Sequence, residues 1–142
     1  MIIGLASDHA GYELKEHLKS FLSKNKEYET INFGCNNNQD PVNYPEFAEL
    51  LCTALKQGKV SKGILVCGSG QGMAMAANRY TGIRAALCYN QEIARLAKSH
   101  NNANIICLGC NFLEKSLAES ITITWLKTEF EKGRHQTRIN LI

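Results

Sequence analysis

Hydrophobic residues along the chain form short runs that alternate with segments of amphipathic helical spacing. The runs are typical of buried β-strands. They cover Ile2 to Ala6, Tyr28 to Phe33, Gly63 to Cys67, Ile83 to Cys88 and Asn104 to Leu108. Between and after them, apolar residues recur every three or four positions, as on one face of a helix. Strands that alternate with helices in this way predict a parallel sheet covered on both faces.

The helical segments also carry boundary signals. The first helix follows Gly11, and Pro45 suits the first turn of the second, where a missing N–H costs nothing. Further helices are predicted over Met73 to Tyr80, over Gln91 to Ser99, and along the apolar stripe from Leu113 to Trp125. The basic tail that follows ends in apolar residues and is expected to dock on another surface.

Together these elements predict the α/β class: a single domain, residues 1–142, built as a Rossmann-like three-layer α/β/α sandwich. The expected order of the five parallel strands is 2-1-3-4-5, and in such sheets ligands bind where the chain reverses direction, outside the carboxyl ends of the strands. The loops at that point are Ser7 to Gly11 and Cys67 to Gly72. The topology therefore predicts that a carboxylate, an imidazole, a thiol and a glycine-rich loop share one crevice.

Composition narrows the class of protein. A net charge of +3, with no block of basic residues and no interleaved aromatics, argues against a nucleic-acid partner. No apolar run approaches the ~20 residues of a membrane span, so no membrane partner is expected. Because no secretory signal is visible, we expect a cytoplasmic protein whose six cysteines are free thiols.

The strongest chemical signal is the loop that begins at Cys67. Three glycines at alternate positions, Gly68, Gly70 and Gly72, let backbone N–H groups face one small volume at the start of a helix. This setting favours a thiolate over a thiol, and it favours the binding of an anion at the loop. The plainer alternative, a buried cysteine at a strand end, does not account for the glycines.

Other interpretations of the same motifs fit less well. A cysteine phosphatase needs an arginine six residues after the thiol, and position 73 is a methionine. The glycine spacing is not the G-x-G-x-x-G of a dinucleotide site, and it follows the third strand instead of the first. The lone C-x-x-C of Cys107 and Cys110 has no second ligand pair for zinc, and it lies at a strand end, which disfavours a thioredoxin-like redox role.

The local sequence does not decide between a structural and a functional role for Asp8, for His100 or for the two arginines of the tail. Asp8 could cap a helix or act on a ligand, and His100 could be a cation at a helix C-terminus. Arg134 and Arg138 could form a solvated basic face or a phosphate clamp, because guanidinium groups match phosphate oxygens. Since they lie far along the chain from the crevice, a clamp requires either folding back or a second subunit.

Several motifs, taken in order, resemble one family from end to end. They are Ser7-Asp8-His9-Ala10-Gly11, Asn43-Tyr44-Pro45, Gly63 to Gly72, Gly82-Ile83-Arg84-Ala85, His100-Asn101-Asn102-Ala103-Asn104, and Gly133-Arg134-His135-Gln136-Thr137-Arg138. The chain resembles the ribose-5-phosphate isomerase B family, the group that also holds the galactose-6-phosphate isomerase subunits. The resemblance implies interconversion of ribose 5-phosphate and ribulose 5-phosphate without metal or other cofactor, in dimers or tetramers whose active sites are shared between subunits.

The resemblance also implies roles for individual residues. Cys67 would move the proton between C2 and C1 through an enediolate, and His100 would open the furanose ring as a general acid. Asp8 would hold or deprotonate a sugar hydroxyl, and Ser69 would shuttle protons or hold the thiol. The backbone N–H groups of the loop would hold the enediolate, Asn101 and Tyr44 would bind the sugar, and a histidine and two arginines would bind the phosphate. The full set of remaining substrate-binding residues is His9, Tyr44, Gly68, Gly70, Gln71, Gly72, Asn101, Asn111, Arg134 and Arg138.

One departure from the family stands out, because many members carry a phosphate-binding arginine where this chain has Asn111. Two alternatives also stay open, the first because the sequence does not give the length of the pocket. The substrate could be a six-carbon sugar phosphate, allose 6-phosphate or galactose 6-phosphate, or the chain could bind sugar phosphates without catalysis.

Overall fold

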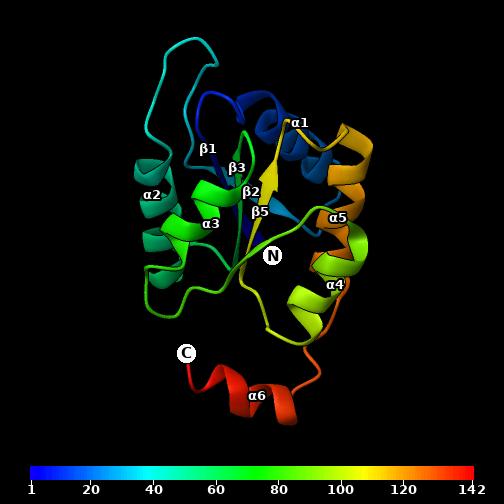
Figure 1. The fold of residues 1–142 in the computed structure, drawn as a ribbon. Helices are drawn as coiled ribbons and strands as arrows, with labels where there is room; N and C mark the ends of the chain where they lie inside the picture. Colours follow the sequence, from blue (N-terminus) through cyan, green and yellow to red (C-terminus); the bar gives the residue numbers. More distant parts are fainter.

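The structure is a computed structural model that describes residues 1–142. Five strands alternate with helices, as the sequence predicts, and a sixth helix closes the chain (Figure 1). The strands are β1 (Ile2–Ser7), β2 (Glu29–Asn32), β3 (Lys62–Cys67), β4 (Ala85–Leu87) and β5 (Ile105–Gly109). The helices are α1 (Tyr12–Ser23), α2 (Tyr44–Lys56), α3 (Gln71–Ala77), α4 (Gln91–Ser99), α5 (Lys115–Lys127) and α6 (Arg134–Ile139). None of the helices is both long and apolar enough to cross a membrane.

All strand pairs are parallel, which confirms the predicted sheet, but the strand order differs at one edge. The observed order is β2-β1-β3-β5-β4, so the predicted order 2-1-3-4-5 is wrong for the last two strands. The physical reason is burial. Every residue of β5 is buried, as expected of a strand covered on both faces, whereas the short β4 is only partly buried and forms the edge. As a result, β5 lies directly beside β3 and brings its carboxyl end to Cys67.

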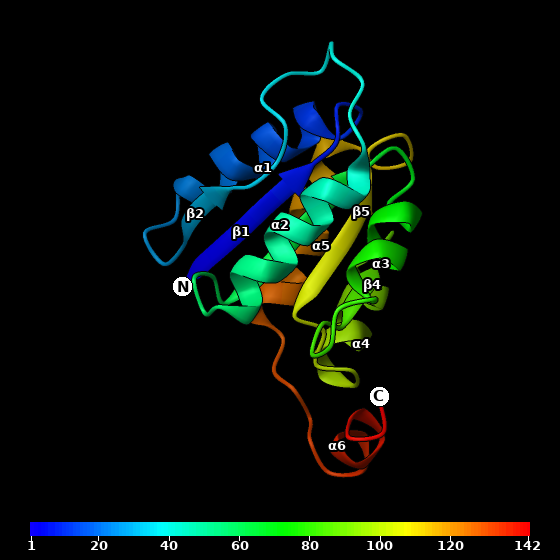
Figure 2. The same cartoon turned by 90° about the vertical axis from the view of Figure 1, so that its left-hand side faces the viewer.

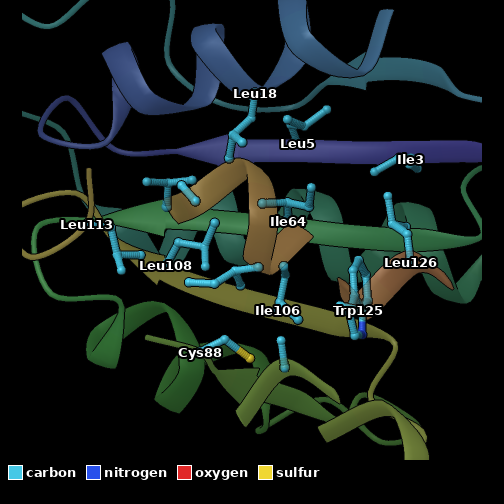
Figure 3. Close-up of a cluster of buried hydrophobic side chains, with 14 of the residues drawn as sticks. Ile3, Leu5, Leu18, Ile64, Cys88, Ile106, Leu108, Leu113, Trp125 and Leu126 are labelled. Carbon is cyan, nitrogen blue, oxygen red and sulfur yellow. The ribbon is translucent and has the colours of Figure 1, made fainter. Parts of the chain in front are cut away.

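Helices cover both faces of the sheet. One hydrophobic cluster packs the sheet against α1, α4 and α5, with Leu18, Ile106 and Trp125 fully buried (Figure 3). A second cluster packs the opposite face against α2 and α3, where Leu51 and Met73 are fully buried. Figure 2 shows α2 and α3 lying across the front of the strands. The sheet is thus the middle layer of the predicted α/β/α sandwich.

Helix α6 lies apart from these layers. The sequence predicts only a basic tail there, whereas the structure forms a short helix after the extended segment that leaves α5. Both ribbon views place α6 beyond the end of the sheet where the strands begin, away from their carboxyl ends (Figures 1 and 2). It contacts its own chain through His135, which is buried although Arg134 and Arg138 on the same helix are exposed.

Candidate active site

The glycine-rich loop joins β3 to α3 at the carboxyl edge of the sheet. Cys67 ends β3 with only 5% of its surface exposed, and the backbone N–H of Gly70 donates to its Sγ atom at 3.1 Å. Gly70 is in the left-handed region at φ 79°, which a residue with a side chain rarely adopts, so this glycine permits the turn that directs its N–H to the sulfur. The backbone N–H of Gln71 donates to Ser69 Oγ at 3.3 Å, which holds the hydroxyl at the loop.

The loop after β1 lies beside it, because β1 and β3 are paired up to Ser7 and Val66. The Asp8 carboxylate accepts a hydrogen bond from Gly11 N at 2.9 Å and is 8% exposed. Gly11, not Asp8, is the N-cap of α1, so the capping interpretation of Asp8 is wrong in detail; its carboxylate holds the turn before the helix. The pairing of Ser7 with Val66 therefore brings the loop that begins at Asp8 beside the loop that begins at Cys67, as the sequence predicts for these two loops.

Three further predicted residues lie around these two loops. His9 Nδ1 accepts a hydrogen bond from Val42 N at 3.2 Å, which leaves Nε2 to carry the proton of the neutral ring. Tyr44 opens α2, and its ring covers Gly72 so closely that a Cβ there would lie 2.7 Å from the ring. Asn111 follows β5, donates its backbone N–H to Gly68 O at 3.0 Å, and places its amide beside Gly68.

The other predicted site residues lie at the opposite edge of the sheet. His100 is the C-cap of α4, and the chain then turns through Asn101 into the start of β5, where Gly63 N donates to Asn104 O. Cys67 pairs with Gly109 at the far end of the same strand. Five steps along a strand separate these positions by roughly 16 Å. Within one chain, therefore, His100, Asn101 and the arginines of α6 do not meet Cys67.

This second group has neighbours to which sequence reasoning assigns no role. The rings of His100 and His135 stack with centroids 4.2 Å apart, and Glu131 approaches both of them. The Arg84 guanidinium donates to the carbonyl oxygens of Asn101 and Asn102 and so fixes the loop that carries Asn101. These residues lie inside or beside the sequence motifs, and this is the only feature of the sequence that could have pointed to them. Their contacts with His100 could not be predicted, because those contacts depend on the fold.

The same cluster offers three metal-ligand atoms within 4.8 Å of one another, from His100, Glu131 and His135. Its geometry does not suit a metal ion. The imidazole lone pairs lie in the ring planes, and two rings stacked at 10° to each other direct those lone pairs side by side. A single ion could not lie about 2.0 Å from both nitrogens along their lone pairs.

All six cysteines are free thiols, and the C-x-x-C pair is split between environments. Cys107 is fully buried within the cluster under α2 and α3, while Cys110 packs against the opposite cluster and donates to Ala10 O at 3.2 Å. Burial raises the pKa of Cys107 well above its usual value, and burial with the nearby Asp8 charge raises the pKa of Cys110. These environments stabilise two protonated thiols on separate faces of the sheet.

The model of the family described as Ribose/Galactose Isomerase matches residues 3–142. The chain belongs to the ribose/galactose isomerase family. This match confirms the resemblance drawn from the sequence motifs, and with it the class of enzyme, an isomerase.

Members of the family are similar over nearly their whole length. Ribose-5-phosphate isomerase B from Escherichia coli (strain K12) is 35% identical over 140 residues, which span 99% of this chain and 93% of the relative. The solved structure of ribose-5-phosphate isomerase B from Clostridium thermocellum has a TM-score of 0.96 and 46% identity, covering 99% of this chain and 94% of that one. The Mycoplasma genitalium enzyme with bound ribulose-5-phosphate has a TM-score of 0.93 and 39% identity, covering 99% and 92%.

Proposed function

We propose that this chain is a cofactor-independent isomerase that interconverts ribose 5-phosphate and ribulose 5-phosphate through an enediolate, as in the pentose phosphate pathway. The observation that carries the proposal is Cys67, whose Sγ atom accepts the Gly70 N–H at 3.1 Å on the loop beside the one that carries Asp8. The ribose-5-phosphate isomerase B relatives, one of them with bound ribulose-5-phosphate, support the substrate.

In the proposed mechanism, the thiolate of Cys67 removes the proton from C2 of the open-chain aldose. Electrons move into a C1–C2 double bond, and negative charge develops on the oxygen at C1. Backbone N–H groups of the loop from Gly68 to Gly72 stabilise that charge. The N–H groups of Gly70 and Gln71 already donate to Cys67 Sγ and Ser69 Oγ, so Gly68, Ser69 and Gly72 supply the remaining donors, and Gln71 is a further substrate-binding residue of the loop. Cys67 then returns the proton to C1, and Ser69 moves the hydroxyl proton between O1 and O2. The thiolate is regenerated, so no cofactor is consumed.

The cyclic sugar must open before this step. We propose that His100 donates a proton to the ring oxygen while Asp8 takes the proton of the C1 hydroxyl, so that charge balances. Asn101 and Tyr44 hold the sugar, and His9, Arg134 and Arg138 bind the phosphate. Asn111 replaces an arginine common in the family, so it would supply a neutral amide at that end of the site.

Because one chain separates these groups by the length of the sheet, the proposal requires a second copy. In a homodimer with two-fold symmetry, the carboxyl end of one subunit's sheet, where Cys67 lies, would be covered by the opposite end of the other subunit. That opposite end carries His100, Asn101, Arg134 and Arg138. Helix α6 supports this arrangement, since it presents exposed arginines away from its own layers. A tetramer would contain the same pair.

The test is turnover by the purified protein in the presence of a chelator. We expect conversion of ribose 5-phosphate to ribulose 5-phosphate, and we expect Cys67→Ala to lower kcat by at least about a thousandfold with little change in substrate affinity. Cys52→Ala, which removes a buried thiol outside the crevice, is the control and should keep kcat.

Three other results would decide between the remaining alternatives. Turnover of only allose 6-phosphate or galactose 6-phosphate would keep the chemistry and change the substrate. Binding of sugar phosphates without proton exchange at C2 would favour the non-catalytic binding protein. Full activity of the Cys67→Ala protein would contradict the assigned base.

A further inference from the structure

Two stacked imidazoles lie where the start of α6 meets the end of α4, and one of them, His135, has no role in the proposed site so far. The rings of His100 and His135 are nearly parallel, with centroids 4.2 Å apart and planes at 10°. His135 is buried, with 7% of its surface exposed, whereas the His100 side chain keeps 35% exposure. The contact joins α6 to the end of α4, so the orientation of His100 depends on a residue of the C-terminal helix.

The Glu131 carboxylate lies close to both rings. Glu131 Oε2 lies 3.7 Å from His100 Nε2 and 3.6 Å from His135 Nε2. Its backbone is fixed, because Glu131 N donates to Ser99 O at 2.9 Å. Two imidazolium rings face to face would repel each other strongly, and a single carboxylate offsets only one of the two charges. Near neutral pH the pair therefore favours one bound proton over two.

The charges around the pair decide which ring holds that proton. Burial, followed by the charges of His100 and Arg134, lowers the pKa of His135, while Glu131 acts in the opposite direction. Arg138 on the same helix adds to the lowering.

The groups that face the pair from α4 are Glu92, whose charge acts on His100, and Arg95, whose charge acts on Glu131. Glu131 lies near both rings, and Arg95 holds both oxygens of Glu92, so the two rings differ in that His100 is the more exposed and that the charges of Arg134 and Arg138 act on His135.

We propose that Glu131 and His135 are positioning residues that hold His100 as the protonated member of a one-proton imidazole pair, ready to open the sugar ring. The inference rests on the proposed function, because it assigns how the general acid of that same site is kept charged. In the step itself, the bond between C1 and the ring oxygen breaks as His100 gives its proton to that oxygen. The C1 hydroxyl loses its proton to Asp8. Before the next turnover Asp8 releases this proton to solvent and His100 takes one up from solvent, so the protons balance.

Nuclear magnetic resonance of the imidazole nitrogens tests the pair without substrate. In the wild-type protein we expect the two rings to titrate in two coupled steps, the first proton appearing on His100. In His135→Gln, His100 should titrate in one step at higher pH, because no second ring competes for Glu131. In Glu131→Gln, it should titrate at lower pH, because the compensating charge is gone. Identical titration of His100 in all three proteins would overturn the proposal.

The pH dependence of kcat/KM supplies the second readout. A general acid must be protonated, so kcat/KM falls as pH rises through the titration of that acid. The pH at which this fall occurs, the basic limb of the profile, should move down by about one pH unit in Glu131→Gln and should move up in His135→Gln. His17→Gln is the matched control, since His17 of α1 pairs with Glu119 of α5 at 2.7 Å, makes no contact with His100, His135 or Glu131, and should leave the profile unchanged. Lower activity in both variants with an unmoved limb would show a merely structural role. If the protein lacked isomerase activity altogether, the titration would still decide the inference.

Discussion

At the residue scale, the six cysteines of the chain differ in burial and in the groups that contact their thiols. Cys52, Cys88 and Cys107 are fully buried, and burial raises the pKa of Cys52 to about 11 and that of Cys88 to about 12. Cys67 ends β3 at the carboxyl end of the sheet, and its Sγ atom accepts a hydrogen bond from the backbone N–H of Gly70. The glycines that follow Cys67 predicted that a backbone N–H would face the thiol. The sequence could not predict that Asn111 would lie beside Gly68, because that contact depends on β5 pairing with β3.

Alkylation should separate these thiols. With limiting iodoacetamide at pH 7, we expect the extent of Cys67 modification to equal the loss of activity. Ribulose 5-phosphate should slow both the modification of Cys67 and the loss of activity. Peptide mass spectrometry identifies the modified site. Cys110 is the half-exposed competitor, so the Cys110→Ser protein should be inactivated in the same way. Inactivation with Cys67 still unmodified would contradict this assignment.

At the element scale, the position of α2 determines where Tyr44 lies. Leu51 on α2 is fully buried against β1 and β3, and a Cβ on Gly4 or Gly63 would lie 2.2 or 2.8 Å from its methyl carbons. The glycines therefore let the helix approach the sheet closely. The sequence predicted the helix and its apolar stripe. It did not predict the edge position of β4, because a run of alternating βα units fits either order of the last two strands until their burial is known.

Removing that contact should cost stability. Leu51→Ala leaves a cavity between α2 and the sheet and should lower the free energy of unfolding by about 2–5 kcal/mol. Leu50→Ala is the neighbouring control, since Leu50 is 52% exposed and its loss should change stability by less than about 0.5 kcal/mol. Urea unfolding followed by circular dichroism measures both, and equal effects would show that α2 does not dock through Leu51.

At the scale of the whole molecule, the residues assigned to one reaction lie at two ends of a sheet. The sequence motifs named both groups, and the strand order explains why Asp8 and Cys67 meet. It also separates His100 from them by the length of β5. Sequence reasoning found the arginines of the tail but not helix α6 or the stack of His135 on His100, because both depend on how the last segment returns to α4. The proposed mechanism therefore requires two copies of the chain for one active site.

Mixing two inactive variants tests this requirement most directly. Cys67→Ala and His100→Asn homodimers should each lose activity, because every site lacks one essential group. After subunit exchange at equal concentrations, half of the dimers would be mixed and each would contain one intact site, so about a quarter of the wild-type activity should return. Native mass spectrometry confirms that mixed dimers form. Mixed dimers that stay inactive would contradict a site shared between Cys67 of one subunit and His100 of the other.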